Sequence, residues 1–146
     1  MKFPYIRQPS SVNPSPPYIA RPLIPIRLSL KAMHLDTYAL VDSGADRSVF
    51  HLRFADELLI DLESSKKEFY FGIGGQPVAV YHHKVNIQLL GSQHSIDVEV
   101  GFTDAPGVDA ILGEADFFEH YQIKFERYKE SIEIKPSIQI SNTGLH

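Results

Sequence analysis

The amino-acid sequence predicts a single, mainly β domain with one or two short helices. Apolar and polar residues alternate along most of the chain after Pro22, which is the pattern of strands that bury one face. Glycine and proline interrupt these stretches at intervals typical of β-turns. The chain has 146 residues, of which 43% are hydrophobic. This length supports one hydrophobic core and is too short for two domains of ordinary size.

The strand prediction rests on a series of alternating stretches. Residues 24–30 place isoleucine and leucine on one face, residues 35–41 repeat the pattern, and the break between them predicts a β-hairpin. Gly91 and Ser92 predict the turn of a second hairpin. Further strands are predicted at residues 78–80, 85–89 and 96–100.

Two segments have helical spacing instead. Residues 53–60 and 114–121 repeat apolar side chains at intervals of three and four residues, so a short helix is predicted over each. The aromatic side chains of Phe117, Phe118 and Tyr121 lie on one side of the second helix. We expect them in the core, because such a stripe is far more often buried packing than a ligand site.

The two ends of the chain differ from the rest. Seven of the ten prolines lie within the first 25 residues, so residues 1–21 are predicted to form an extended arm. The domain itself is expected over residues 22–135, followed by a C-terminal tail over residues 136–146. Isoleucines alternate over residues 132–140, interrupted by Pro136. This interruption favours an edge strand or a strand shared between subunits over a central strand.

Charge and cysteine content exclude several classes of protein. Fourteen Lys and Arg stand against eighteen Asp and Glu, with no basic run, so nucleic acid is not an expected partner. The absence of cysteine excludes disulfides, thiolate metal sites and a cysteine nucleophile. No apolar stretch has the length of a signal peptide or a membrane span. We therefore expect a soluble, cytoplasmic protein that does not bind membranes.

The segment with the clearest chemical potential reads Leu-Val-Asp-Ser-Gly-Ala-Asp-Arg-Ser at positions 40–48. An apolar strand ends at Asp42, Ser43 follows with a hydroxyl, and Gly44 permits a tight turn and the close approach of another backbone. This arrangement suits a functional site. It also suits an ordinary Asx-turn at the end of a strand, so these residues alone leave both interpretations open.

Two further motifs follow along the chain. Residues 71–77 read Phe-Gly-Ile-Gly-Gly-Gln-Pro, a glycine-rich tip between strand-like segments of the kind that a mobile hairpin needs. Residues 108–113 read Val-Asp-Ala-Ile-Leu-Gly, an apolar strand that ends in glycine. In this order, the three motifs make residues 22–134 resemble the retropepsin-like aspartic proteases, the family of the retroviral proteases.

The resemblance implies a fold, an activity and a set of site residues. The fold is a closed, barrel-like acid protease fold, and the activity is hydrolysis of peptide bonds in extended polypeptides, with no metal or organic cofactor. Asp42 matches the catalytic aspartate, and Ser43, Gly44 and Ala45 match the residues that support the catalytic loop. The positions that match substrate-binding residues are Asp46, Gly72, Ile73, Gly74, Gly75 and Ile111.

The chemistry of this family also constrains assembly. Two carboxyl groups share one proton, so that one activates a water molecule while the other, protonated, donates to the carbonyl oxygen of the cleaved bond. The sequence contains one Asp-Ser-Gly triplet and lacks the length for a second lobe. The expected assembly is therefore a two-fold symmetric homodimer that supplies Asp42 twice, with a polypeptide substrate as its other partner.

One departure from the family pattern favours an alternative function. Retroviral members have an arginine where this chain has Glu114, and that arginine pairs with the acidic residue matched here by Asp46. Without this contact, the chain could serve as a dimerisation or peptide-binding module of the same fold with little or no catalysis.

Histidines and glycines raise the possibility of a metal or phosphate ligand. His82, His83 and His94 could form a metal site, but consecutive residues of a strand face opposite sides, so surface imidazoles are expected instead. The glycines of residues 72–75 could bind phosphate, but no Lys-Ser or Lys-Thr pair follows them and no helix is predicted to begin there.

Overall fold

The computed structural model describes residues 1–10, 17–71 and 75–137 of the chain. These residues include one α-helix, α1 (Leu52–Glu57), and three 3-10 turns, η1 (Leu62–Ser64), η2 (Phe118–His120) and η3 (Arg127–Lys129). The strands are β1 (Lys2–Pro4), β2 (Ile6–Pro9), β3 (Tyr18–Arg21), β4 (Leu23–Leu30), β5 (Met33–Val41), β6 (Val49–His51), β7 (Lys66–Phe71), β8 (Pro77–Leu89), β9 (Ser95–Thr103), β10 (Ala110–Leu112), β11 (Tyr121–Glu126) and β12 (Ser131–Pro136).

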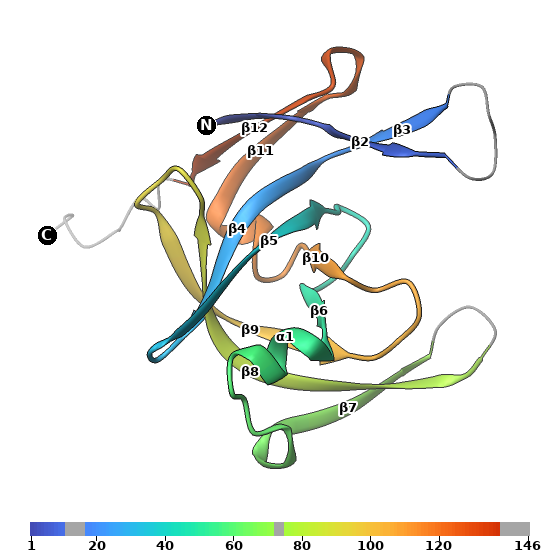
Figure 1. The fold of residues 1–146 in the computed structure, drawn as a ribbon, viewed down its shortest axis with the longest axis vertical. Coiled ribbons are helices and arrows are strands. Elements are labelled where there is room, and N and C mark those ends of the chain that lie inside the picture. Colours follow the sequence, from blue (N-terminus) through green and yellow to red (C-terminus); the bar gives the residue numbers. More distant parts are fainter. Residues whose placement is uncertain (11–16, 72–74, 138–146) are drawn as a thin grey trace, which may run out of the picture.

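A closed barrel of six strands forms the centre of the molecule. Strands β4, β5, β10, β6, β9 and β8 pair in that order, and a further pairing of β4 with β8 closes the ring. Among the described strands, β7 pairs only with β8 and forms with it a hairpin that extends from the barrel (Figure 1). The prediction of a mainly β, closed-barrel fold with a short helix is therefore confirmed.

The two hairpins predicted from alternation are present. β4 and β5 pair antiparallel from Leu23 opposite Leu40 to Leu30 opposite Met33. β8 and β9 pair antiparallel and are joined through Gly91, whose φ of 87° lies in the left-handed region that favours glycine. In both hairpins the period-two pattern is a local signal, and Gly91 adds a turn signal in the second, which explains why the sequence revealed them.

Two parallel pairings bring distant segments to one edge of the barrel. β10 inserts between β5 and β6, parallel to β5, and β6 runs parallel to β9. Because the carboxyl ends of parallel strands meet at the same edge of a sheet, the end of β5 at Val41 lies beside the end of β10 at Leu112. The segments that follow these two strands, residues 42–48 and 113–117, therefore come together.

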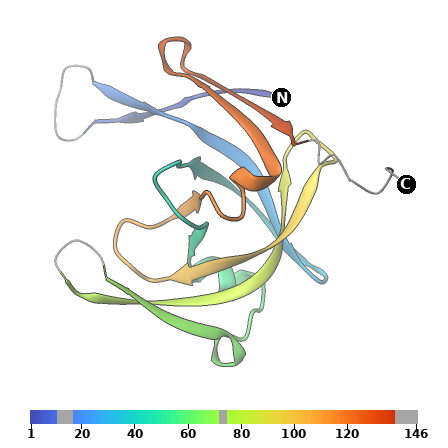
Figure 2. The ribbon, with the colours of Figure 1, turned by 180° about the vertical axis from the view of Figure 1, so that it is seen from behind.

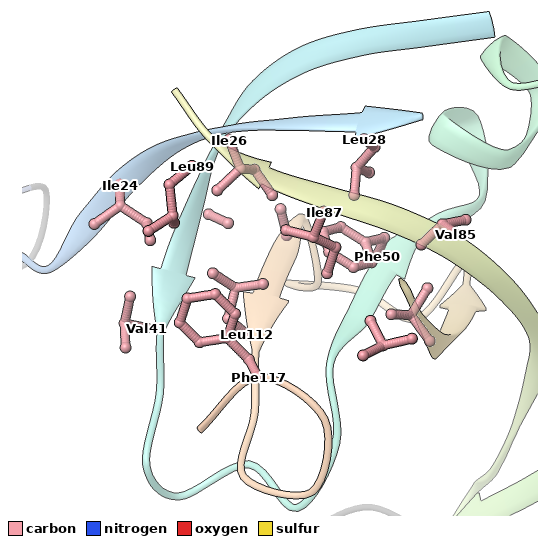
Figure 3. Packing of buried hydrophobic residues seen from close by; sticks show 14 of the residues in the cluster. Ile24, Ile26, Leu28, Val41, Phe50, Val85, Ile87, Leu89, Leu112 and Phe117 are labelled. Atoms are coloured by element: carbon pink, nitrogen blue, oxygen red, sulfur yellow. The ribbon is translucent and has the colours of Figure 1, made fainter. Parts of the chain in front are cut away.

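The barrel is filled by apolar side chains from nearly every strand (Figure 3). Ile26 and Leu28 of β4 pair with Leu89 and Ile87 of β8, and all four are buried. Phe117 lies in the same core and is fully buried. Burial of such side chains removes apolar surface from water and is the main favourable contribution to folding.

The predicted helix over residues 53–60 is present but shorter, because α1 ends at Glu57. His51 accepts a hydrogen bond from the Arg53 N–H at the first turn, and Phe54 faces the core. Leu59 has a φ of 57° and is 75% exposed, so the prediction that it continues the apolar face of the helix is wrong. The left-handed conformation at Leu59 ends the helix after less than two turns.

The predicted helix over residues 114–121 is wrong. A turn follows Gly113, then the 3-10 turn η2, and Tyr121 already begins β11. The segment cannot continue as an α-helix because Tyr121 pairs with Pro136 in a sheet. The expectation that the aromatic residues are core packing is confirmed, since Phe117 and Tyr121 are buried and Phe118 packs against the core.

A second sheet of three strands, in the order β1, β12, β11, lies at the opposite end of the barrel from the β7–β8 hairpin (Figures 1 and 2). β12 is its central strand, so the preference for an edge strand around Pro136 is wrong. The Ile134 N–H donates to the Met1 carbonyl, and Pro136, two residues on, has its nitrogen on the same side. β1 pairs only with residues 131–133, so the proline removes no contact with β1.

The N-terminal segment is extended, as β1, β2 and β3, and its first part packs on the barrel. Phe3 and Tyr5 are 8% and 7% exposed and belong to the core cluster. β2 pairs with β3 as a two-stranded ribbon, and Arg7 of β2 forms an ion pair at 2.9 Å with Glu130, the residue after η3. The division of the chain at residues 22 and 136 stays a prediction.

Tyr121 gives a testable link between this packing and pH. Burial raises the pKa of its hydroxyl from 10.0 to about 12, and the hydroxyl lies 2.8 Å from His94 Nδ1. Above about pH 10 the unfolded chain therefore loses this proton before the folded chain does, so the free energy of unfolding falls as pH rises. Phenylalanine has no proton to lose, so this contribution is absent in Tyr121→Phe. On going to about pH 11, the free energy of unfolding of the variant should fall by about 1.4 kcal/mol less than that of the wild type, as measured by denaturant unfolding. Tyr128→Phe, at a tyrosine that is 81% exposed, should leave the loss unchanged.

Candidate active site

The candidate site begins where β5 ends. The Asp42 N–H donates to the Leu112 carbonyl at 3.0 Å, which fixes the first residue of the loop against the end of β10. Asp42 Oδ1 accepts a hydrogen bond from the Gly44 N–H at 2.9 Å, and the Ala45 N–H donates to the Asp42 carbonyl at 3.2 Å. The loop is thus an Asx-turn that presents a half-buried carboxyl group. The turn interpretation is therefore confirmed, and the site interpretation stays a prediction.

The turn after β10 holds the second half of the loop. The N–H groups of Glu114 and Ala115 donate to the carbonyls of Ala45 and Asp46 at 2.9 and 2.8 Å. These contacts join two segments about seventy residues apart through main-chain atoms alone. The position of Asp42 is therefore set by the barrel strands on both sides of it.

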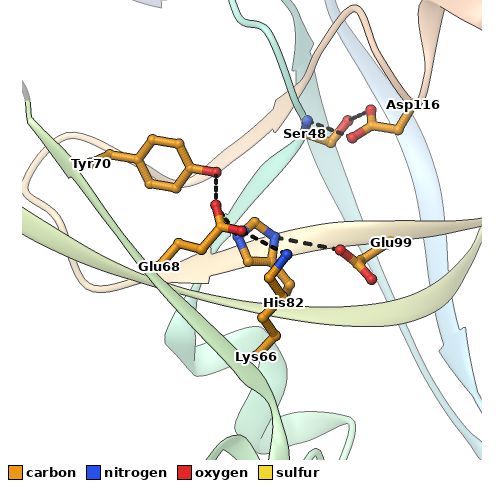
Figure 4. A network of polar contacts seen from close by, with 7 residues as sticks. All are labelled: Ser48, Lys66, Glu68, Tyr70, His82, Glu99 and Asp116. Atoms are coloured by element: carbon orange, nitrogen blue, oxygen red, sulfur yellow. Dashed lines mark hydrogen bonds and ion pairs between the residues drawn. The ribbon is translucent and has the colours of Figure 1, made fainter.

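A buried polar pair secures the end of the loop. Ser48 is fully buried and Asp116 is 8% exposed. The Asp116 carboxylate accepts hydrogen bonds from the Ser48 N–H at 2.8 Å and from the Ser48 hydroxyl, and that hydroxyl accepts one from the Gly113 N–H at 3.0 Å (Figure 4). Every group in the pair has a partner, as buried polar groups require. Sequence reasoning missed both residues.

A cavity of about 380 Å³ lies beside this loop. Most of its wall is apolar and comes from the loop itself, from the β7–β8 hairpin and from the segment between β9 and β10. Its lining residues are Ala45, Asp46, Arg47, Ser48, Val49, Tyr70, Val78, Val80, His82, Gly101, Thr103, Ala105 and Val108. A cavity of this size and lining suits one large apolar side chain of a bound chain.

The structure brings together only part of the residue set predicted for the site. Ala45 and Asp46 line the cavity, whereas Ile111 does not and instead pairs with Leu40 and Val49 inside the sheet. The remaining predicted residues fall into two groups. Asp42, Ser43 and Gly44 form the turn next to the cavity, and Gly75 is exposed with a φ of 73°. Gly72, Ile73 and Gly74 lie outside the described residues.

His82 is the clearest surprise among the cavity residues. The sequence favoured a surface imidazole, but His82 is 5% exposed and lies between Glu68 and Glu99. His94 instead contacts Tyr121, so the histidines do not converge. No group of three or more histidine, aspartate or glutamate side chains in the described ranges could hold a metal ion. The expectation of surface imidazoles is wrong for His82 because that side chain lines the cavity beside the Asp42 loop, where it is buried.

Asp46 and Glu114 share a shallow surface depression with Glu119. Among the described residues no lysine, arginine or histidine lines this depression, so it gathers three acidic side chains without a basic partner. We expect Glu114→Arg to place a guanidinium beside Asp46 and, if the loop borders a subunit interface, to strengthen dimerisation about threefold at low salt. Sedimentation equilibrium at two salt concentrations measures this. Glu63→Arg, an exposed site on η1, is the matched control, and an equal gain from both variants would mean that net charge alone is responsible.

No helix among the described residues is both long enough and apolar enough to cross a membrane.

Of the comparisons with known proteins, the one with solved structures gives matches. No protein-family model and no curated protein matches the chain. Solved structures that resemble it include EIAV protease complexed with the inhibitor HBY-793. That protein is 25% identical in sequence, and the match covers 64% of this chain and 81% of that chain with a TM-score of 0.46.

Proposed function

We propose that this chain is one protomer of a homodimeric aspartic endopeptidase whose catalytic group is Asp42. The observation that carries the proposal is the setting of Asp42. Its carboxyl group is half-buried at the end of β5, oriented by the Gly44 N–H, and held in place by main-chain bonds to the end of β10. A carboxyl group fixed in this way, with access to solvent, can hold and transfer a proton at one defined position.

The reaction requires a second carboxyl group, which a second copy of Asp42 would supply. With one proton shared between the two, the ionised Asp42 takes a proton from a water molecule as its oxygen attacks the peptide carbonyl carbon. The protonated Asp42 gives its proton to the carbonyl oxygen, so a tetrahedral diol forms. A proton then passes to the amide nitrogen, the carbon–nitrogen bond breaks, and the products are a carboxylic acid and an amine.

The surroundings of the loop favour a polypeptide substrate. The cavity of about 380 Å³ borders the loop at Ala45 and Asp46, directly after the turn that carries Asp42. Its walls include Val49, Val78 and Val80. An extended chain bound across the loop could therefore place an apolar side chain in this cavity while a neighbouring peptide bond lies near Asp42. Apolar residues are expected on at least one side of the cleaved bond.

The direct test is cleavage of an unstructured polypeptide. We expect the purified chain, incubated with such a substrate over a range of pH, to generate new termini that mass spectrometry assigns to apolar positions. Activity should be highest on the acidic side of neutrality, because the pair of carboxyl groups must retain one proton. In ¹⁸O-labelled water each new carboxyl terminus should carry the label, since water attacks directly.

The alternative function, a dimerisation or peptide-binding module without catalysis, predicts a different result. Such a chain would bind the polypeptide and remain dimeric but would yield no new termini at any pH. The carboxylates of Asp46 and Glu114 in one depression are the feature that favours this alternative. Measuring binding and cleavage on the same sample separates the two functions.

A further inference from the structure

His82 is a buried histidine whose two ring nitrogens have no hydrogen-bond partner among the described residues. It lies on β8, is 5% exposed, and lines the cavity beside the Asp42 loop. A buried polar atom without a partner costs folding free energy, so such atoms are few in native structures and each needs a physical explanation. His82 also has no part in the hydrolysis proposed above, which leaves its role unexplained.

Each ring nitrogen of His82 faces a carboxylate from a different strand. Nε2 lies 3.6 Å from Glu68 Oε2 on β7, and Nδ1 lies 4.0 Å from Glu99 Oε1 on β9 (Figure 4). The direct cross-strand partners of His82 are Lys66 and Gly101, so Glu68 and Glu99 are diagonal neighbours, each two residues from the direct partner on its strand. The imidazole therefore stands between two strands that do not pair with each other.

The charge state of the ring decides whether both contacts are favourable. A neutral imidazole has one N–H group and one lone pair, so one of its nitrogens must face a carboxylate as acceptor against acceptor. An imidazolium has two N–H groups and can donate toward both carboxylates at once. Small shifts of the glutamate side chains would bring both distances into the hydrogen-bonding range.

Glu68 is held as a carboxylate by its other neighbours. Lys66 Nζ lies 2.9 Å from its Oε1, and the Tyr70 hydroxyl donates to its Oε2 at 2.9 Å. These two hydrogen bonds, with that from Lys66 the larger, lower the pKa of the Glu68 carboxyl group. An acceptor thus faces His82 Nε2 over the pH range in which histidines titrate.

We propose that His82 is a positioning residue which, when protonated, joins Glu68 of β7 to Glu99 of β9 and holds the base of the β7–β8 hairpin against the cavity wall. Deprotonation leaves one carboxylate facing a lone pair, so β7 loses its tie to β9. The consequence for function rests on the proposed endopeptidase activity: a peptide whose side chain fills the cavity should bind more tightly at acidic pH.

Besides the two glutamates, lysine, tyrosine and arginine side chains surround His82 and its partners. Lys66 and Tyr70 act on Glu68 from β7, and Lys84 of β8 is the cross-strand partner of Glu99. The Arg47 guanidinium, on the Asp42 loop, acts on Lys66 and Tyr70. Lysine, arginine and tyrosine side chains keep one charge state between about pH 5.5 and about pH 7.5. A change in the hairpin over this range would therefore point to His82.

Hydrogen exchange of the β7 amides tests the tie without any substrate. The quantity compared is the protection factor of each amide at about pH 5.5 and at about pH 7.5, because a protection factor removes the intrinsic effect of pH on the exchange rate. We expect protection of β7 to fall about tenfold at the higher pH in the wild type, since a hydrogen bond to a charged group is lost. His82→Gln, which can donate but cannot titrate, should show no fall. His83→Gln, at the neighbouring residue on the opposite face of β8, should behave as the wild type.

A second variant, at Glu99, provides an independent test in case His82→Gln does not fold. Glu99 is an exposed residue, and Glu99→Gln removes the charge that faces Nδ1. This variant should also lose the pH dependence of β7 protection while it remains folded. An unchanged tenfold fall in either His82→Gln or Glu99→Gln overturns the proposal, as does a wild type without the fall.

The kinetic readout separates this proposal from the proposed function. If the chain cleaves peptides, KM should rise about tenfold between the two pH values in the wild type and in His83→Gln, and stay level in His82→Gln. The pH dependence of kcat should follow the Asp42 pair in all three proteins. If the chain cleaves nothing, the endopeptidase proposal fails, and the protection factors still decide whether His82 ties the hairpin.

Discussion

Replacing Asp42 by Asn should lower kcat/KM for an unstructured polypeptide by about a thousandfold or more, because the amide can neither accept a proton from water nor share one with a second carboxyl group. The change is nearly isosteric, and the amide oxygen can still accept the hydrogen bond from the Gly44 N–H that now goes to Oδ1. Fold and assembly should therefore be retained, as measured by circular dichroism and sedimentation. Asp56→Asn, at an exposed residue on α1, is the matched control and should keep full activity.

The same variant tests whether two copies of Asp42 form one site. When wild-type and Asp42→Asn chains are mixed in equal amounts and exchange freely, about a quarter of the dimers contain two aspartates. Activity per total chain should fall to about that fraction of the pure wild-type value. A fall to only one half would mean that each chain acts alone, and the shared pair of carboxyl groups would have to be abandoned.

The sequence predicts the parts of this fold that depend on local signals. The β4–β5 and β8–β9 hairpins both have an alternating pattern, the second also has a glycine at its turn, and both are present. A strand at residues 108–113 is predicted, but the place of β10 in the sheet depends on pairings of two residues each with β5 and β6, and such short pairings leave no pattern in the sequence. The predicted helix after Gly113 failed for a related reason, since pairing of Tyr121 in a sheet overrides the helical spacing before it.

In the candidate site, too, the sequence predicts the residues that are close in the chain and misses those that depend on distant contacts. Asp42 and its turn are contiguous in sequence, so one local motif predicts them together. The Ser48 and Asp116 pair joins residues 68 apart, so no local pattern predicts it, and other acidic residues near Asp116 in the sequence hide the one carboxylate that is buried. The burial of His82 could not be read from the alternation of apolar residues, because that alternation shifts by one residue within β8. The buried residues of β8 are even-numbered up to His82 and odd-numbered from Val85.

Replacing Gly113 by Ala should be the most damaging single-methyl change near the site. A Cβ at this position would lie 2.4 Å from the Arg47 carbonyl carbon, 2.6 Å from its oxygen and 2.9 Å from the Ala45 oxygen. All three atoms are main chain of the Asp42 loop, so no side chain can rotate to make room. We expect a loss of about 3 kcal/mol in the free energy of unfolding.

The matched comparison is Gly101→Ala, where a Cβ would meet the Val80 Cγ1 at 2.6 Å. That atom ends a side chain, which can change rotamer, so the loss should be nearer to about 1 kcal/mol. Gly113→Ala must also displace the loop that the Glu114 and Ala115 N–H groups hold, and a shift of about 1 Å at a catalytic group costs about a hundredfold in rate. Denaturant unfolding and kcat/KM of both variants measure the two effects. Equal losses of stability at the two glycines would show that the main chain of the Asp42 loop moves at no greater cost than a valine side chain. The close fit between the end of β10 and the Asp42 loop would then not be what holds the carboxyl group in place.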